Sequence, residues 1–242
     1  MYTFNSRIRY SEVDKDATLT IESLIDYFQD CSTFQTQDGT ASMEYLREKG
    51  MAWVLNSWQI EIERLPKLCE YVTIGTIPYM LRGPLGLRNF FMETKDGERL
   101  AVANSYWTLF DFNKGVPCKV TPEIVEAYPV EDKLPMEYRD RKIVIPEGGE
   151  RFEAEDIVVR EHHLDTNNHV NNGQYIRMAI GRLPEQDVKV CSLRAEYKKQ
   201  AFLSDVLHPI VIMNNMGDNK IYTVSLNDEE GAAVCVVELK CK

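Results

Sequence analysis

The chain has 242 residues, and its 44% hydrophobic and 27% charged residues are typical of a folded globular protein, which argues against extensive disorder. The formal net charge of -10 disfavours nucleic acid as the main partner, because binding to phosphates needs a basic surface. No apolar stretch approaches the roughly 20 residues of a membrane-spanning helix, and the N-terminal residues lack the features of a signal peptide. We therefore expect a cytoplasmic protein. Its six cysteines show no CxxC pair and no metal-ligand spacing, so we expect free thiols and no metal site.

The first half of the chain predicts a short extended piece, two helices and an antiparallel meander. Apolar residues from Ile21 to Phe28 follow the i, i+3, i+4, i+7 spacing of one buried helical face. Thr20 can cap the start of this helix, and Gly39 can end it. A second helix is expected at residues 41–49. The expected strands cover residues 4–10, 58–62, 71–77, 87–94 and 101–112.

The composition changes between residues 129 and 155, where prolines, dense charge and the pair Gly148-Gly149 interrupt regular structure. We interpret this segment as a connector between a first domain at residues 1–128 and a second domain at residues 156–242. The second domain repeats the order of the first. Its expected elements are a strand at 156–161, a helix at 174–183 ended by Pro184, and strands at 188–198, 208–214, 221–226 and 232–240.

The two halves can be aligned on each other. Asp165 lies 151 residues after Asp14, and Glu196 lies 135 residues after Glu61; both offsets also match apolar residues with apolar residues. Few residues are identical, but the shared order of elements favours an internal duplication over coincidence. A helix wrapped by an antiparallel sheet, present twice, predicts an α+β fold with two hotdog domains in tandem.

The densest polar cluster covers residues 162–175 and contains three of the four histidines. It lies where the predicted strand gives way to the start of the predicted helix. Such a place suits carbonyl chemistry, because free N–H groups at a helix start can stabilise a reacting carbonyl oxygen. Asp165, Asn167 and His169 occupy alternate positions, which in an extended segment would place their side chains on one side. An Asp can orient an imidazole, an Asn can donate to an oxyanion or hold a water, and an imidazole titrates near neutrality. Turn and cap formation is the alternative use of these residue types.

Residues 164–172, followed by Tyr175, resemble the signature of the acyl-acyl carrier protein (ACP) thioesterases of bacteria and plant plastids. Residues 51–55, 60–62, 106–107 and 196–199 also resemble this family, so the resemblance covers nearly the whole chain. It implies hydrolysis of long-chain acyl-ACP to free fatty acid, which terminates fatty acid synthesis. It further implies that Asp165, Asn167 and His169 are catalytic, that no cofactor is needed, and that the acidic carrier protein is the partner.

The sequence departs from the family at one place. Many relatives carry an acidic residue after the Glu-Tyr-basic-basic stretch, followed in plants by a Cys, whereas this chain has Gln200 and Ala201. Neither residue can act as a nucleophile of the Cys type, and Gln200 cannot be a general base, so a Cys–His mechanism is disfavoured. Attack by water remains, with His169 or Asp165 accepting the proton and Gln200 at most orienting the water.

The first-half equivalents of the motif are Asp14, Asp16 and Thr18. Because no imidazole is present there, we expect that half to have lost catalysis and to house much of the acyl chain. Several basic residues of the second half could form a docking patch for the acidic carrier protein or could simply be scattered over the surface. They are Arg177, Arg182, Arg194, Lys198 and Lys199.

Three other functions stay open at this point. An acyl-CoA thioesterase would share the chemistry, and single-hotdog members of that class carry a shortened form of the same motif. A hotdog hydratase or dehydratase is disfavoured by the Asn-rich motif, since that reaction has less need of a water-positioning amide. A non-catalytic acyl-binding protein is disfavoured as a DNA-linked sensor, because no helix-turn-helix or basic arm is present. The sequence specifies neither the preferred acyl chain nor whether a homodimer forms.

Overall fold

The computed structural model describes residues 1–185 and 188–242. The chain forms two compact units, one made of Met1–Ser57 and Glu63–Arg139 and the other of Trp58–Ile62 and Asp140–Lys242. The boundary at residue 139 falls inside the predicted connector, and the strand β2 (Met51–Ile62) contributes to both units. None of the helices in the described ranges is long and apolar enough to cross a membrane.

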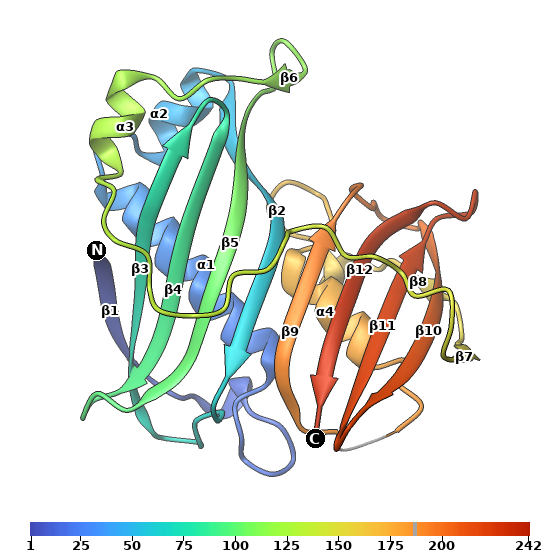
Figure 1. The fold of residues 1–242 in the computed structure, drawn as a ribbon. Coiled ribbons are helices and arrows are strands. Elements are labelled where there is room, and N and C mark those ends of the chain that lie inside the picture. Colours follow the sequence, from blue (N-terminus) through green and yellow to red (C-terminus); the bar gives the residue numbers. More distant parts are fainter. Residues whose placement is uncertain (186–187) are drawn as a thin grey trace. The chain divides into compact units, whose positions relative to one another are not determined.

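In the first unit, the helix α1 (Ile21–Asp38) lies across one face of an antiparallel sheet (Figure 1). The helix begins where the Thr20 side chain accepts the N–H of Ser23 at 3.1 Å and ends at Gly39, as the sequence predicts. Its buried face packs against the sheet through contacts such as that of Phe28 with Phe90, whose ring centroids are 5.4 Å apart. The sheet has the order β1 (Tyr2–Arg7), β3 (Tyr71–Arg82), β4 (Leu85–Thr94), β5 (Arg99–Asp111).

Four short elements accompany this sheet in the first unit, the first of them the 3-10 helix η1 (Tyr10–Glu12). The helix α2 (Met43–Glu48) is capped by Ser42, and the short strand β6 (Val116–Pro117) pairs with β5. The helix α3 (Pro122–Ala127) lies before the connector and was not predicted. Its start is nevertheless readable in the sequence, because Thr121 caps it and Pro122 occupies the first helical position.

In the second unit, the helix α4 (Asn172–Ile180) packs against β11 and β12 of another antiparallel sheet (Figure 1). The helix ends at Gly181 and not at Pro184, because the next N–H groups, of Arg182 and Leu183, donate to carbonyls only three residues back, those of Ala179 and Ile180, at 3.2 and 3.1 Å. The sheet has the order β9 (Val190–Tyr197), β12 (Ala233–Cys241), β11 (Asn219–Asn227), β10 (Val206–Met216), β7 (Glu150–Glu153).

Two predictions for the segment before α4 are wrong in detail. The predicted connector contains β7, which pairs with β10 directly after Gly149, a glycine with φ of 120°. The predicted strand at 156–161 is only β8 (Ile157–Val158), and the chain then turns into the 3-10 helix η2 (Glu161–His163). Each unit is thus a helix covered by an antiparallel sheet, which confirms the predicted α+β class.

Candidate active site

The polar cluster folds into a tight turn that precedes α4. Leu164 and Val170 form an isolated antiparallel bridge at the base of the turn, and the chain reverses between them. Asn168 has φ of 61°, in the left-handed region that Asn adopts more readily than most residues. The segment is therefore not extended, and the predicted one-sided alternation of side chains is wrong as a description of its backbone.

Asp165 holds the turn together. Its Oδ1 accepts the backbone N–H groups of Asn167 at 2.8 Å and of His169 at 3.3 Å. The side-chain amide of Asn167 lies 3.5 Å from Asp165 Oδ2, and the N–H of Asp165 donates to the carbonyl of His169 at 2.8 Å. These bonds bring all three predicted residues into one turn, with the carboxylate bonded to the backbone of the turn.

The imidazole of His169 is half-buried and packs edge-on against the ring of Phe202, with the centroids 5.0 Å apart. Within the described ranges, no residue forms a hydrogen bond with this imidazole, so the expected orienting bond from Asp165 is not formed. Both ring nitrogens are consequently available to a substrate or a water. Phe202 was not predicted, and only the alignment of the two halves could have drawn attention to it.

Gln200 lies beside this turn because the next residue, Ala201, is hydrogen-bonded to it. The carbonyl of Ala201 accepts the N–H of Val170 at 3.0 Å, and the N–H of Ala201 donates to the Tyr175 hydroxyl at 2.9 Å. Burial raises the pKa of Tyr175, so this phenol stays neutral and can accept. The Gln200 side chain is exposed and has no hydrogen-bond partner in the part of the chain that the structure describes.

The start of α4 is already capped by the turn itself. The Asn171 side chain accepts the N–H of Gly173 at 2.8 Å, and its carbonyl accepts the N–H of Gln174 at 3.0 Å. Two of the first amides of the helix are therefore occupied, contrary to the expectation that they face a reacting oxygen. The exposed side-chain amide of Asn167 is the better placed donor for a developing oxyanion.

The other histidines have local partners or lie in solvent. His163 Nδ1 accepts the N–H of Arg160 at 3.0 Å and caps η2. Burial, together with the nearby His162, lowers the pKa of His163 and keeps the imidazole neutral. His162 is exposed, and His208 Nδ1 lies 2.7 Å from Asp156 Oδ1. We assign these rings to structure or solvent.

The basic residues proposed as a docking patch are not all available to a partner, because some form ion pairs within the chain. Arg194 is paired with Glu238 at 3.1 Å and also donates to the carbonyl of Asp140 at 2.6 Å, with only 12% of its side chain exposed. Lys199 pairs with Asp228 at 2.7 Å. Arg194 therefore has a structural role within the second unit.

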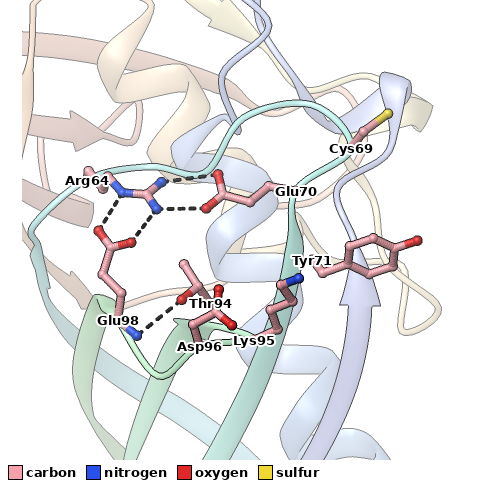
Figure 2. Close-up of a pocket in the computed structure, with 8 residues that line it drawn as sticks. All are labelled: Arg64, Cys69, Glu70, Tyr71, Thr94, Lys95, Asp96 and Glu98. Carbon is pink, nitrogen blue, oxygen red and sulfur yellow. Dashed lines mark hydrogen bonds and ion pairs between the residues drawn. The ribbon is translucent and has the colours of Figure 1, made fainter.

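A surface pocket of the first unit also gathers charged residues (Figure 2). Arg64 donates to Glu70 at 2.7 and 3.1 Å and to both carboxylate oxygens of Glu98 at 2.7 Å. The N–H of Glu98 in turn donates to the Thr94 hydroxyl at 3.1 Å. This guanidinium is fully engaged by its two carboxylates, so these ion pairs tie together the loops that carry Arg64, Glu70 and Glu98. No group of three or more His, Cys, Asp or Glu side chains in the described ranges is arranged to hold a metal ion.

Comparison with known proteins identifies the family of the chain. The model of the acyl-ACP thioesterase N-terminal domain matches residues 1–128, and that of the C-terminal domain matches residues 147–240. A chloroplastic acyl-[acyl-carrier-protein] hydrolase of Cuphea viscosissima is 25% identical over 95% of this chain and 59% of the relative. The chain thus spans less than two thirds of the length of that relative.

Solved structures share the fold at low sequence identity. A Lactobacillus plantarum protein described as an oleoyl thioesterase superposes with a TM-score of 0.90 at 22% identity, over 100% of this chain and 95% of its own. An acyl-ACP thioesterase of Bacteroides thetaiotaomicron gives a TM-score of 0.87 at 21% identity, over 99% of this chain and 97% of its own. The fold is the double hotdog of these proteins, and the chain belongs to the acyl-ACP thioesterase family.

Proposed function

We propose that the chain hydrolyses long-chain acyl-ACP in the cytoplasm, releases free fatty acid and thereby ends chain elongation. Membership of the family supports the reaction. The observation that supports the choice of residues is the turn at Asp165–His169. It contains an exposed amide and an imidazole that forms no hydrogen bond with any residue of the described ranges.

In the proposed reaction, a water molecule attacks the thioester carbonyl carbon and His169 accepts its proton. The new C–O bond forms a tetrahedral intermediate, whose negative oxygen is stabilised by the side-chain amide of Asn167. The intermediate then collapses, the C–S bond breaks, and the imidazolium returns its proton to the leaving thiolate of the carrier. The products are a fatty acid and the free thiol.

The remaining polar residues position the reacting groups. Asp165 fixes the backbone at His169, because its Oδ1 accepts that N–H. Gln200, exposed beside the turn, orients the attacking water. The interior of the first unit holds aromatic side chains such as Phe28 of α1 and Phe90 of β4, which suits that unit to hold an acyl chain.

The proposal is tested by product analysis with a ladder of acyl-ACP substrates of increasing chain length, with the matching acyl-CoA substrates alongside. We expect free fatty acid from acyl-ACP, with a clear optimum of chain length and a lower rate on CoA. Faster turnover of CoA thioesters would identify the chain as an acyl-CoA thioesterase. Acyl-chain binding without product from either carrier would identify a non-catalytic acyl-binding protein.

A further inference from the structure

The imidazole of His169 is in contact with an aromatic ring where a catalytic histidine usually has a hydrogen bond. Such imidazoles are ordinarily oriented by a bond from one ring nitrogen to a carboxylate or a carbonyl. Here Asp165 Oδ1 accepts two backbone N–H groups of the turn, and no residue in 1–185 or 188–242 is hydrogen-bonded to the imidazole. The ring of Phe202 lies against the imidazole, with the centroids 5.0 Å apart and the planes at 72°.

The backbone that carries Phe202 is fixed by its own loop. The N–H of Phe202 donates to Asp205 Oδ2 at 2.8 Å, and its carbonyl accepts the N–H of Asp205 at 3.1 Å. The carbonyl of Ala201 accepts the N–H of Val170 at 3.0 Å. This last bond joins the residue before Phe202 to the residue after His169. The aromatic ring is therefore carried by a backbone that is held beside the turn.

The same loop occurs in the first unit with a different side chain at this place. There the N–H of Lys67 donates to Glu70 Oε2 at 2.9 Å, and the carbonyl of Lys67 accepts the N–H of Glu70 at 3.0 Å. Each loop has a left-handed residue next, Cys69 with φ of 68° or Ser204 with φ of 73°. Lys67 thus occupies the place of Phe202, so this backbone does not require an aromatic side chain.

Burial in the core does not account for the aromatic side chain either. Phe202 is 48% exposed, and the next residue, Leu203, is 49% exposed. An edge-to-face pair of rings changes the population of an orientation by about two- to tenfold. It also leaves the nitrogens of His169 unoccupied, whereas an orienting hydrogen bond would engage one of them. The feature that Phe202 adds to the loop is its contact with the imidazole.

We propose that Phe202 is a positioning residue for His169, whose imidazole it holds in the orientation from which the proton of the attacking water is accepted. The ring contact restricts the rotation that a hydrogen bond would otherwise restrict, and a correctly oriented base raises the rate of the chemical step. Phe202 acts through the imidazole and takes no proton itself. This inference rests on the proposed function and deepens it.

Steady-state kinetics on the acyl-ACP that the unaltered protein hydrolyses fastest tests the role. Phe202→Ala should lower kcat about three- to tenfold and leave KM within about twofold, because fewer imidazoles have the productive orientation. Phe202→Tyr keeps the ring and should retain kcat within about 1.5-fold. Leu203→Ala, at the equally exposed next residue, is the matched control and should change neither constant. If Phe202→Ala does not fold, Phe202→Lys gives the same test, since the first-unit loop carries a lysine there.

Proton NMR measures the contact without turnover. Nuclear Overhauser effects should join the ring protons of Phe202 and His169 in the unaltered protein, because the centroids are 5.0 Å apart. The imidazole signals, assigned by their absence from His169→Gln, should shift in Phe202→Ala as the ring current is lost. They should stay in place in Leu203→Ala.

The outcomes separate the role of Phe202 from the function itself. The role is overturned if Phe202→Ala keeps its kcat, if its loss lies only in KM, or if Leu203→Ala loses as much. An active protein without the ring contact in its NMR spectrum would also overturn it. A protein that hydrolyses no acyl-ACP would instead overturn the proposed function, on which the role depends.

Discussion

The turn at residues 164–170 has a near copy at residues 13–19 of the first unit. Each turn is closed by an antiparallel bridge and contains a left-handed residue, Ala17 with φ of 54° or Asn168 with φ of 61°. In each, an Asp accepts two backbone N–H groups through Oδ1, at 2.9 and 3.0 Å for Asp14 and at 2.8 and 3.3 Å for Asp165. The backbone of the turn is therefore independent of the chemistry, since only one copy contains an imidazole.

The copies differ in the side chains above this backbone. Thr18 stands where His169 stands, and Lys67 stands where Phe202 stands, because each follows the residue whose carbonyl anchors its turn. The Lys67 ammonium donates to the Thr18 hydroxyl at 2.5 Å and occupies it, whereas Phe202 only supports the imidazole through its ring. The comparison teaches that Asp165 is first an anchor and that the pair His169–Phe202 distinguishes the turn proposed to be catalytic from its copy in the first unit.

The largest expected effect is at the imidazole that only one of the two turns contains. His169→Ala should lower kcat about a hundredfold or more, the scale of lost general acid–base catalysis. Thr18→Ala, the matched change in the other turn, should leave kcat nearly unchanged. Steady-state kinetics on acyl-ACP measures both, and equal losses at the two positions would mean that the site is misplaced.

The anchoring role of the aspartates predicts a stability effect in both turns. Asp165→Ala and Asp14→Ala should each lower the free energy of unfolding by about 1–3 kcal/mol, because two backbone N–H groups lose their charged acceptor. Only Asp165→Ala should also reduce turnover, by about a hundredfold. Asp165→Asn, which keeps an acceptor oxygen at Oδ1, should recover most of the stability. Urea unfolding and kinetics on the same samples separate anchoring from catalysis.

A change at Gln200 tests the one position at which the turn region departs from many relatives. Gln200→Glu should retain activity or raise it severalfold at most, because Glu has nearly the same shape and restores the carboxylate that many relatives carry. A carboxylate beside His169 would also stabilise the imidazolium, so the acidic limb of the pH–rate profile should move to higher pH. Loss of turnover in a folded variant would show that Gln200 is a required amide donor.

The smallest expected effect concerns the caps that precede the turns. His163 Nδ1 caps Arg160, whereas a Glu12 carboxylate oxygen caps the N–H of Arg9 at 2.8 Å. Burial lowers the pKa of His163 below its ordinary 6.5. Its cap therefore contributes stability in full above pH 6.5, and this is lost as the pH falls through the lowered value. Burial opposes ionisation of Glu12, but hydrogen bonds from Arg9 and Tyr27 outweigh it and lower its pKa below 4.5.

The hydrogen bonds that form the two caps should consequently be lost at different pH values. Between pH 7.5 and 5.5, the hydrogen-exchange protection factor of the Arg160 amide should fall severalfold while that of the Arg9 amide stays constant. His163→Asn, which caps without titrating, should abolish the fall. A parallel loss at Arg9 would instead indicate general loosening of the protein.

Local signals made much of the fold predictable. Thr20, Gly39 and the apolar spacing between them define α1 almost to the residue, because capping and burial of one face depend on neighbours in sequence. β7 could not be found in this way, since residues 150–153 form a strand only because β10 offers them an edge. For the site, the motif supplied Asp165, Asn167 and His169. It gave no sign of Phe202, whose contact with the imidazole depends on chain reversal.

The pairing of β7 also bears on how the protein avoids aggregation. Without β7, the N–H and C=O groups of β10 at Ile210–Met213 would form an open sheet edge in an apolar stretch, and such edges recruit strands from other molecules. β7 covers these residues with a strand in which Glu150, Arg151 and Glu153 are charged. Its own outer edge therefore discourages further pairing. The segment that joins the two units thus also disfavours self-association of the second unit through the edge of β10.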